Sequence, residues 1–256
     1  MNLHFDENGP RHASAIVFLH GTPLSGRMWA PQLERLSEFH CLAPDLPGHG
    51  RSAAGAPFTS LEEASSLVAA LIEKETSDAR AHLVGLSFGG VVAQHLMVSR
   101  PELVENVVLS GTSARLSRFL VSVQALNEPV LRMLKPEQLS ILIANQFNIP
   151  PEFRRMFEDD LRAFKPSTLM KVMKAYSSIE TPFSTRSRTL VAVGQKETPV
   201  ARRAARLLSH TIPGAVGVMV PYMGHVWNLQ APDLFSQVVR AWVRGVGLPS
   251  GLIPIR

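Results

Sequence analysis

The stretch Gly85-Leu86-Ser87-Phe88-Gly89-Gly90 lies directly after the apolar run Ala81-His82-Leu83-Val84 and directly before the helical pattern Val91-Val92-Ala93-Gln94-His95-Leu96. Glycines two residues before and after Ser87 let the chain turn sharply from strand into helix without Cβ clashes. Such a turn holds the serine in a strained conformation with its Oγ projecting. The helix N-terminus beneath it favours negative charge that develops nearby. The stretch therefore predicts a strand–turn–helix unit that presents a nucleophilic serine.

Other apolar runs alternate with helical patterns on both sides of this unit. The runs are apolar at successive positions, which is typical of strands buried on both faces; they cover residues 15–19, 41–43, 82–84, 107–109, 189–193 and 216–220. Helices are indicated by a capping-box pattern at Thr59-Ser60-Leu61-Glu62, by Thr198-Pro199, and by the spacing that follows Ala231-Pro232-Asp233. The alternation predicts an α/β fold, with a mostly parallel central sheet and helices on both faces.

Residues 113–185 interrupt this alternation. They contain no strand-like run between the strand that ends near Ser110 and the one that starts near Thr189. Helical patterns instead cover residues 116–134, 136–147, 151–164 and 168–176. We therefore expect a core of residues 1–112 and 186–256, with residues 113–185 inserted between strands as a helical cap. The Met and Phe residues of the cap suit an adaptable apolar lining, although holding the cap together is an alternative role for them.

The composition is that of an ordinary globular protein. The 256 residues are 45% hydrophobic and 18% charged, with a mean hydropathy of +0.08, which excludes a disordered chain, a collagen-like repeat and a coiled coil. The longest clean apolar run, residues 67–72, is far shorter than the roughly 18–20 residues of a membrane span. A single cysteine, Cys41, and a start without the features of a secretory signal favour a cytoplasmic location.

The net charge of +5 comes from the middle of the chain, where residues 113–206 contain 16 Lys and Arg against eight Asp and Glu. These basic residues are scattered, and no nucleic-acid-binding motif accompanies them. We therefore expect a solvated basic face, with no nucleic-acid or membrane partner. A positive field over a pocket that takes acidic substrates stays open as an alternative.

Four motifs resemble those of the α/β-hydrolase superfamily. They are His20-Gly21-Thr22-Pro23, Pro44-Asp45-Leu46-Pro47-Gly48-His49-Gly50-Arg51-Ser52, the Ser87 turn, and Gly224-His225. Each follows a predicted strand, they occur in the family's order, and the resemblance covers nearly the whole chain. Ligands bind at the carboxyl ends of the strands in open α/β sheets. The resemblance implies an α/β-hydrolase fold and a capped, esterase-like member with a serine nucleophile.

The same resemblance implies a triad of Ser87, His225 and Glu197. Serine needs a base to take its proton, and the pKa of histidine lies near neutrality. Of nine histidines, His225 alone follows the last predicted strand, where the family keeps its base. The family usually places an Asp in a G-x-x-D turn after the preceding strand, whereas Gly194-Gln195-Lys196-Glu197 places a Glu there. The extra methylene moves the carboxylate by about 1.5 Å, so the loop must compensate.

The family has an alternative position for the acid, after the strand that contains Val107-Val108-Leu109, but Ser110-Gly111-Thr112 offers no carboxylate there. Glu197 has the alternative role of stabilising only the N-terminus of the helix that Thr198 opens. His20, His49 and Asp45 belong to the loop motifs, and we interpret them as residues that shape the backbone and take no part in proton transfer.

The family's geometry also implies two backbone N–H donors for the oxyanion, those of Thr22 and Phe88. Pro23 has no N–H to give, which leaves Thr22 as the donor of its loop. Trp29 and Trp227 flank the expected site in sequence. They are candidate substrate-binding residues, with core packing as the alternative.

These residues together predict a serine hydrolase, in particular a carboxylesterase that acts on small to medium acyl esters through an acyl-enzyme. We expect neither a metal nor an organic cofactor, since no His, Cys and carboxylate set has metal-ligand spacing. The alternatives on the same triad are a carbon–carbon bond hydrolase, a lactonase and a perhydrolase. An alternative of another class is a ligand receptor of the same fold. Relatives with an aspartate nucleophile, such as haloalkane dehalogenases and epoxide hydrolases, are excluded by Ser87.

Overall fold

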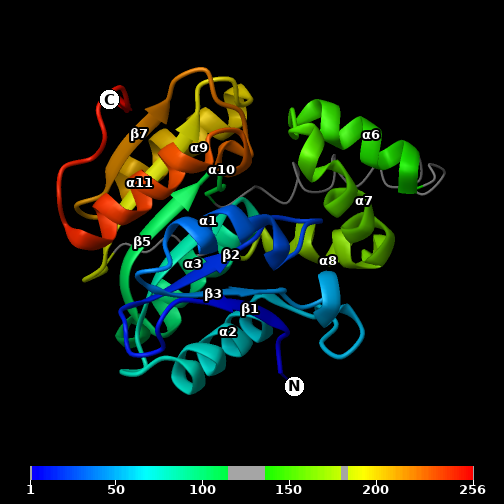
Figure 1. The fold of residues 1–256 in the computed structure, drawn as a ribbon, viewed down its shortest axis with the longest axis horizontal. Coiled ribbons are helices and arrows are strands. Elements are labelled where there is room, and N and C mark those ends of the chain that lie inside the picture. The colour runs from blue at the N-terminus through cyan, green and yellow to red at the C-terminus, as the bar shows by residue number, and fades with distance from the viewer. Residues whose placement is uncertain (1, 115–135, 180–183, 256) are drawn as a thin grey trace.

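A computed structural model describes residues 2–114, 136–179 and 184–255. The strands of these residues form an eight-stranded sheet in the order β1-β3-β2-β4-β5-β6-β7-β8 (Figure 1). The strands from β3 to β7 run parallel, and β1 and β8 pair antiparallel at the two edges. Their bounds are β1 Phe5–Asn8, β2 Ala15–Leu19, β3 His40–Pro44, β4 Ala81–Leu86, β5 Val104–Ser110, β6 Arg188–Gly194, β7 Val216–Val220 and β8 Ile253–Pro254.

The six predicted strands correspond to β2 through β7. All five residues of β2 are buried, as the unbroken apolar run indicates, because helices cover both faces of a parallel sheet. The two edge strands were not predicted. β1 contains Asp6 and Glu7, and β8 is only two residues long, so neither has an apolar run from which a strand could be recognised.

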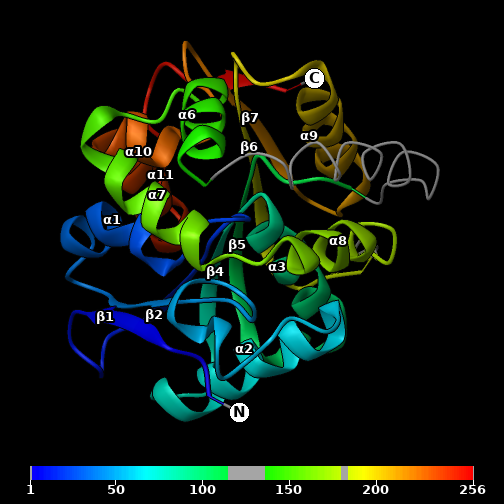
Figure 2. The same ribbon diagram turned by 90° about the vertical axis from the view of Figure 1, so that its right-hand side faces the viewer.

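Successive residues of the strands β2 to β7 contribute to two separate hydrophobic clusters. In β2, Val17 and Leu19 belong to the cluster under α2, α3 and α9, while Ile16 and Phe18 belong to the cluster under α1, α10 and α11. The predicted arrangement of helices on both faces is therefore confirmed (Figures 1 and 2). The helices are α1 Ala30–Arg35, α2 Leu61–Glu75, α3 Phe88–Ser99, α9 Pro199–Thr211, α10 Trp227–Gln230 and α11 Pro232–Arg244.

Local capping explains where two of these helices begin. The side chain of Ser60 accepts a hydrogen bond of 3.2 Å from the backbone N–H of Glu63, so the cap of α2 lies one residue later than the predicted Thr59. The hydroxyl of Thr198 accepts a hydrogen bond of 3.2 Å from the N–H of Ala201, and Pro199 is the first residue of α9. The prediction for α9 is confirmed.

Among the described residues between β5 and β6 there are three helices: α6 Pro136–Gln146, α7 Arg154–Ala163 and α8 Pro166–Ala175. They correspond to three of the predicted cap helices and lie to one side of the sheet (Figures 1 and 2). The predicted helix over residues 116–134 is outside the described residues. The division of the chain into a core and a cap at residues 113 and 185 stays a prediction, and we use "cap helices" below for α6, α7 and α8.

A buried carboxylate fastens the cap helices to the rest of the molecule. The side chain of Asp160 on α7 is fully buried and accepts hydrogen bonds from the backbone N–H of Ser25 at 2.8 Å and from its hydroxyl. Arg27 donates a further hydrogen bond to it at 2.5 Å. A buried carboxylate is tolerated where several donors satisfy it, so this group fixes α7 over the loop that follows β2. None of the helices in the described ranges is of a length and apolarity that could carry it across a bilayer.

Candidate active site

Ser87 occupies the turn between β4 and α3. It has φ 53° and ψ −114°, a left-handed conformation that is strained for a residue with a side chain. Its backbone N–H donates to the carbonyl of Ser110 at 2.9 Å, and the hydroxyl of Thr112 donates to its carbonyl at 2.8 Å. The end of β5 therefore holds the strained turn in place. The predicted strand–turn–helix unit is present.

A close approach of backbones explains the glycine two residues after Ser87. A Cβ atom at Gly89 would lie 2.0 Å from the carbonyl oxygen of Leu19, so α3 reaches the end of β2 only with glycine at this position. A Cβ at Gly21, in the loop after β2, would lie 3.1 Å from the Cβ of Ser87. That loop and the serine are thus immediate neighbours.

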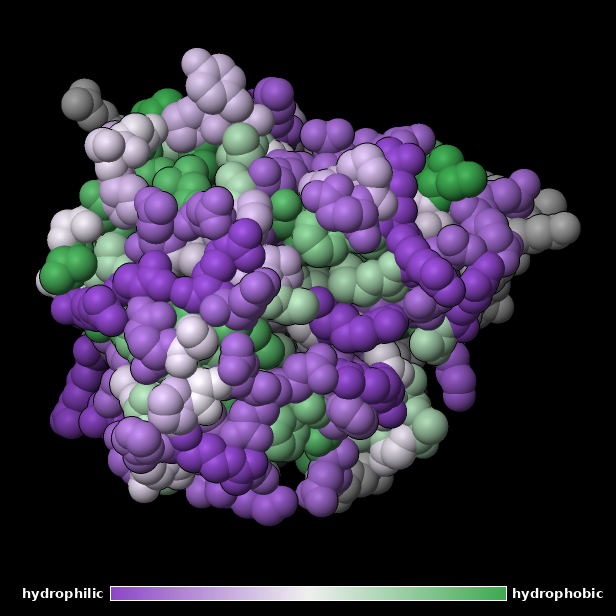
Figure 3. All heavy atoms as spheres, in the orientation of Figure 1, coloured by the Kyte–Doolittle hydropathy of each residue, from purple (hydrophilic) through white to green (hydrophobic). Residues whose placement is uncertain are grey.

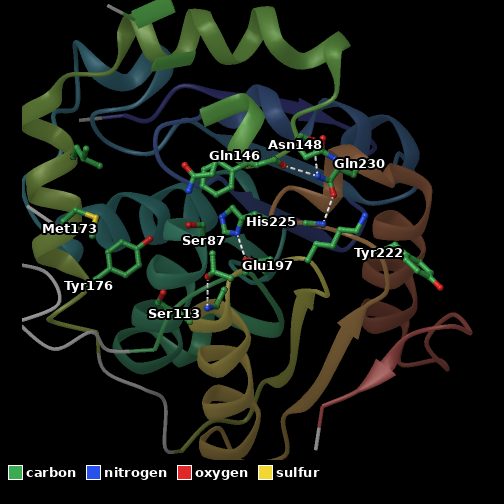
Figure 4. Close-up of a pocket in the computed structure, with 18 of the residues that line it drawn as sticks. Ser87, Ser113, Gln146, Asn148, Met173, Tyr176, Glu197, Tyr222, His225 and Gln230 are labelled. Atoms are coloured by element: carbon green, nitrogen blue, oxygen red, sulfur yellow. Dashed lines mark hydrogen bonds and ion pairs between the residues drawn. The ribbon is translucent and has the colours of Figure 1, made fainter. Parts of the chain in front are cut away.

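His225 and Glu197 form a hydrogen-bonded pair. The Nδ1 atom of His225 lies 2.8 Å from Oε2 of Glu197, and the two side chains are 17% and 3% exposed (Figure 4). Nδ1 donates to the carboxylate, because an ionised carboxylate only accepts. The other ring nitrogen, Nε2, is then free to accept a proton. Glu197 comes from the loop after β6 and His225 from the loop after β7, as the sequence predicts.

Gly111, the residue after β5, leaves the space that this pair occupies. A Cβ atom there would lie 2.9 Å from Oε1 of Glu197 and 2.9 Å from Nδ1 of His225. Its φ of +53° also favours glycine. The family's alternative position for the acid, after this strand, therefore holds a residue without a side chain. The side chain of Glu197, which is longer than that of the usual Asp, occupies the space beside Gly111.

Ser87, Glu197 and His225 line one pocket of about 590 Å³ between the strand ends and the cap helices (Figure 4). This volume is in the usual range for small-molecule sites. We call it the active pocket. Its other described lining residues are Gly111, Ser113, Gln146, Phe147, Asn148, Leu169, Met170, Met173, Tyr176, Lys196, Thr198, Val200, Ala201, Tyr222, Gly224 and Gln230.

The cap contributes aromatic and methionine side chains to this pocket. Phe147, Met170 and Met173 line it, so part of the predicted apolar lining is present. The ring of Phe147 lies 4.9 Å from the imidazole of His225, centroid to centroid. Met133 lies outside the described residues, whereas Phe157 is buried in the hydrophobic cluster, the alternative role that the sequence left open.

Tyr176, at the end of α8, was missed by the sequence analysis. It is buried, its ring lies 6.2 Å from that of Phe88, and its hydroxyl is near enough to the side chain of Ser87 for that group to act against the effect of burial on its pKa. Figure 4 shows its hydroxyl pointing toward Ser87. Burial raises the pKa of Tyr176 to about 12, so the hydroxyl stays protonated near neutrality. The only sequence signal was an aromatic residue at the end of a predicted cap helix.

The two predicted N–H donors lie next to Ser87. Phe88 is the first residue of α3, where backbone N–H groups have no acceptor within the helix. Thr22 follows Gly21, which contacts Ser87, and its hydroxyl is held by Nε2 of His49 at 2.9 Å. The two residues are therefore in the neighbourhood where an oxyanion on a substrate would form.

The prediction that Trp29 and Trp227 bind substrate needs correction. Both are fully buried and neither lines the active pocket. Trp29 packs on Phe18 at 5.2 Å, and Trp227 packs on Phe235 at 4.3 Å, centroid to centroid. The indole N–H of Trp227 donates to the hydroxyl of Ser110 at 2.8 Å. Large aromatic side chains gain most from full burial, and core packing is what the structure shows for both.

The loop histidines are structural, as interpreted. Nε2 of His20 accepts from the N–H of Leu46 at 2.8 Å, and Nδ1 of His49 lies 2.9 Å from the carbonyl of Pro47. Burial lowers the pKa of His20, and it lowers the pKa of His49 to about 3. Both rings therefore stay neutral and brace the loops around Thr22.

Asp45 likewise has a structural position. It is buried and accepts hydrogen bonds of 2.8 Å from the backbone N–H groups of Gly26 and Arg51. Burial acts to raise the pKa of Asp45, but the hydrogen bonds from Arg51 and Gly26, together with other nearby groups, outweigh it and the pKa is lowered. Among the residues that the structure describes, no three His, Cys, Asp or Glu side chains are grouped so that they could hold a metal ion.

The fold and this site define an α/β hydrolase. A model of the alpha/beta hydrolase family matches residues 16–238, and the chain belongs to this family. Curated relatives include the lipase LipV of Mycobacterium tuberculosis, 39% identical over 109 residues, which are 43% of this chain and 41% of the lipase. The carboxylesterase YbfK of Bacillus subtilis is 23% identical over 94% of this chain and 84% of its own length.

Solved structures agree with the fold. A hydrolase from Pseudomonas aeruginosa PA01 superimposes with a TM-score of 0.81 at 23% identity, over 94% of both chains. A thermophilic esterase from Thermogutta terrifontis superimposes with a TM-score of 0.80 at 22% identity, over 95% of this chain and 93% of the esterase. Identities this low establish the common fold, while reaction and substrate have to be argued from the site.

Proposed function

We propose that the protein is a serine carboxylesterase, which hydrolyses small to medium acyl esters with Ser87, His225 and Glu197. Oγ of Ser87 attacks the carbonyl carbon, and its proton passes to Nε2 of His225. His225 then gives this proton to the alcohol oxygen as the carbon–oxygen bond breaks, which leaves the acyl group on Ser87. Water, activated by His225 in the same way, releases the acid and restores Ser87.

The observation that carries the proposal is the hydrogen bond between Nδ1 of His225 and Glu197. It fixes the tautomer in which Nε2 can accept a proton, and the carboxylate stabilises the imidazolium that forms. The strained turn at Ser87, in the same pocket, supplies the nucleophile that this base requires. A purely structural histidine would be expected to have a fully buried ring, whereas the ring of His225 is partly exposed in the pocket that also contains the strained Ser87.

The negative charge of the tetrahedral intermediate needs donors. In the proposed reaction the backbone N–H groups of Thr22 and Phe88 supply them, and the N-terminus of α3 adds the favourable field of its dipole. Esterases and other hydrolases among the relatives support the reaction class.

The test is steady-state hydrolysis of p-nitrophenyl acetate and butyrate, supplied in large excess over the protein. We expect many turnovers per molecule, and we expect Ser87→Ala and His225→Ala to lose turnover by on the order of 10⁴–10⁶ while folding normally. A ligand receptor of the same fold would release at most one slow equivalent of p-nitrophenol per molecule. That outcome would contradict the proposal.

A further inference from the structure

A second cavity, of about 300 Å³, lies between the cap helices and the loop that follows β2. We call it the cap chamber. α6 contributes Leu139, Leu142, Ile143 and Gln146, and Phe147 follows it; the remaining described lining residues are Thr22, Pro23, Leu161, Phe164, Pro166 and Leu169. Three cap helices and the loop of the proposed oxyanion donor thus line one partly open space.

The chemistry of the cap chamber is that of a hydrocarbon site. Seven of its described lining residues are Leu, Ile or Phe, and none carries a charge. The hydroxyl of Thr22 is already hydrogen-bonded to His49, which leaves the amide of Gln146 as the polar side chain of this lining. An apolar cavity with so few polar groups favours an apolar ligand, because the ligand loses no hydrogen bonds on entering it.

Hydrophobic side chains also reach the surface beside the cap chamber. Leu142, which lines it, is 52% exposed, whereas Ile141, on the same helix, is outside the lining and faces solvent at 63% exposure. Figure 3 shows hydrophobic surface over α6, on a face that is otherwise mostly hydrophilic. An exposed apolar side chain in the lining of a cavity is typical of a site that an apolar ligand covers.

The cap chamber adjoins the active pocket. Gln146, Phe147 and Leu169 line both, so these side chains form the boundary between the two cavities. Thr22 borders the cap chamber, whereas His225 borders the active pocket. A carbonyl oxygen that accepts from the N–H of Thr22 therefore sits where the two cavities approach each other.

The chemistry of ester hydrolysis then decides which arm of the substrate enters which cavity. His225 must return a proton to the alcohol oxygen, so the alcohol portion lies on the side of His225, in the active pocket. The acyl chain leaves the same carbonyl carbon on the other side, toward the cap chamber. The alcohol portion faces a mixed lining, in which Ser113, Asn148 and Lys196 are polar and Met170, Met173 and Val200 are apolar.

We propose that the cap chamber binds the acyl chain, and that the substrates are esters of an uncharged, medium-length hydrocarbon acid. This inference rests on the proposed esterase reaction, because that reaction orients the substrate. The chamber also determines a preferred length. We expect kcat/KM to rise about fourfold for each methylene buried, up to an optimum near about six to eight carbons.

The first experiment measures kcat/KM for p-nitrophenyl esters of two to sixteen carbons with the full-length protein and with Ile143→Trp, which fills the cap chamber. We expect the ratio of octanoate to acetate hydrolysis to fall by about 10- to 100-fold, since several methylenes lose their site. Ile141→Trp is the matched control, because Ile141 lies on the same helix but faces solvent. It should keep the chain-length profile of the unaltered protein.

A second series varies the alcohol, from ethyl to octyl acetate. The proposal predicts that Ile143→Trp changes the acyl-length profile and leaves the alcohol-length profile in place. If the alcohol-length profile changes and the acyl-length profile does not, the chamber holds the alcohol arm and the proposal is overturned. The proposal is also overturned if Ile143→Trp has the same acyl-length profile as Ile141→Trp while its unfolding temperature is that of the unaltered protein.

A binding measurement separates this inference from the proposed reaction. Octanamide is a neutral, unreactive probe with the same hydrocarbon chain, and its binding can be followed by calorimetry. We expect it to bind at least tenfold more weakly to Ile143→Trp than to Ile141→Trp. If ester turnover is absent but this difference is found, the reaction is wrong and the chamber stands as a hydrocarbon site. If turnover is present and octanamide binds both variants equally, the chamber assignment is wrong.

Discussion

The imidazole of His225 and the carboxylate of Glu197 are joined by a hydrogen bond of 2.8 Å, although the residues are 28 positions apart in the chain. Two parallel strands, β6 and β7, make this possible, because they end side by side and place their following loops at the same edge of the sheet. The pair therefore depends on the pairing of these strands, and on the space that Gly111 leaves beside it.

Glu197→Gln keeps the size of the side chain and removes its charge. We expect kcat to fall by on the order of 10²–10⁴, because an amide neither fixes the tautomer of His225 nor stabilises its protonated form. Steady-state kinetics on p-nitrophenyl butyrate measures this. Glu197→Asp should retain more activity than Glu197→Gln if the loop can adjust. Equal activity of Glu197→Gln and the unaltered protein would show that another group orients His225.

Gly111→Ala should damage the site and the fold together. Its Cβ would crowd both Glu197 and His225 at 2.9 Å, and its φ of +53° is strained for alanine. We expect a loss of about 1–3 kcal/mol in the free energy of unfolding and at least a tenfold loss of kcat. Gly214→Ala is the control, since Gly214 has φ +69° with no atom within 4 Å of the added Cβ. Gly214→Ala should lose stability but keep its activity. A loss of activity equal to that of Gly111→Ala would contradict the steric explanation.

Tyr176→Phe removes the hydroxyl that contacts Ser87 and retains the ring against Phe88. We expect kcat/KM to fall by about tenfold, the cost of one hydrogen bond that this hydroxyl would make to the reacting groups during turnover. The pH profile between pH 5 and 9 should keep its shape, because a pKa of about 12 keeps this hydroxyl protonated throughout that range. Kinetics that match the unaltered protein would show that the contact has no role in the reaction.

The buried His49 should make the fold sensitive to acid. Its pKa is lowered to about 3 by burial, so the unfolded chain binds a proton below about pH 6.5 that the folded chain does not. Its contribution to stability is therefore full above that pH, and is lost at up to about 1.4 kcal/mol per unit as pH falls toward 3. Urea unfolding at pH 7, 5.5 and 4.5 measures this. His49→Gln should show a shallower dependence, and an equal slope would contradict the assignment.

Much of the fold could be predicted from local patterns. Buried parallel strands have unbroken apolar runs, so β2 through β7 were recognised, and Thr198-Pro199 placed the start of α9. The edge strand β1 was missed because it carries the charged Asp6 and Glu7, which pair with Arg51 and with Arg11 and His40, and so has no apolar run. Capping of α2 by Ser60 in place of Thr59 shows the one-residue error that pattern matching leaves at helix ends.

The candidate site was predictable only where a residue follows a strand. Ser87, Glu197 and His225 were identified in this way, since strand order brings their loops together. Tyr176 was not, because its position depends on how α8 packs over the core, which no local pattern encodes. Trp29 and Trp227 show the reverse, since nearness in sequence to a catalytic loop does not determine where a large side chain points.

The central claim is that Ser87 is a nucleophile activated by His225, and covalent labelling tests it most directly. Oγ of Ser87 should displace fluoride from an alkyl fluorophosphonate while His225 takes the proton, and mass spectrometry of the digested protein locates the adduct. We predict one adduct per chain, on Ser87, with none in Ser87→Ala and labelling of His225→Ala slowed by on the order of 10³-fold. An unlabelled Ser87, or an adduct elsewhere with full ester turnover in Ser87→Ala, would contradict the account.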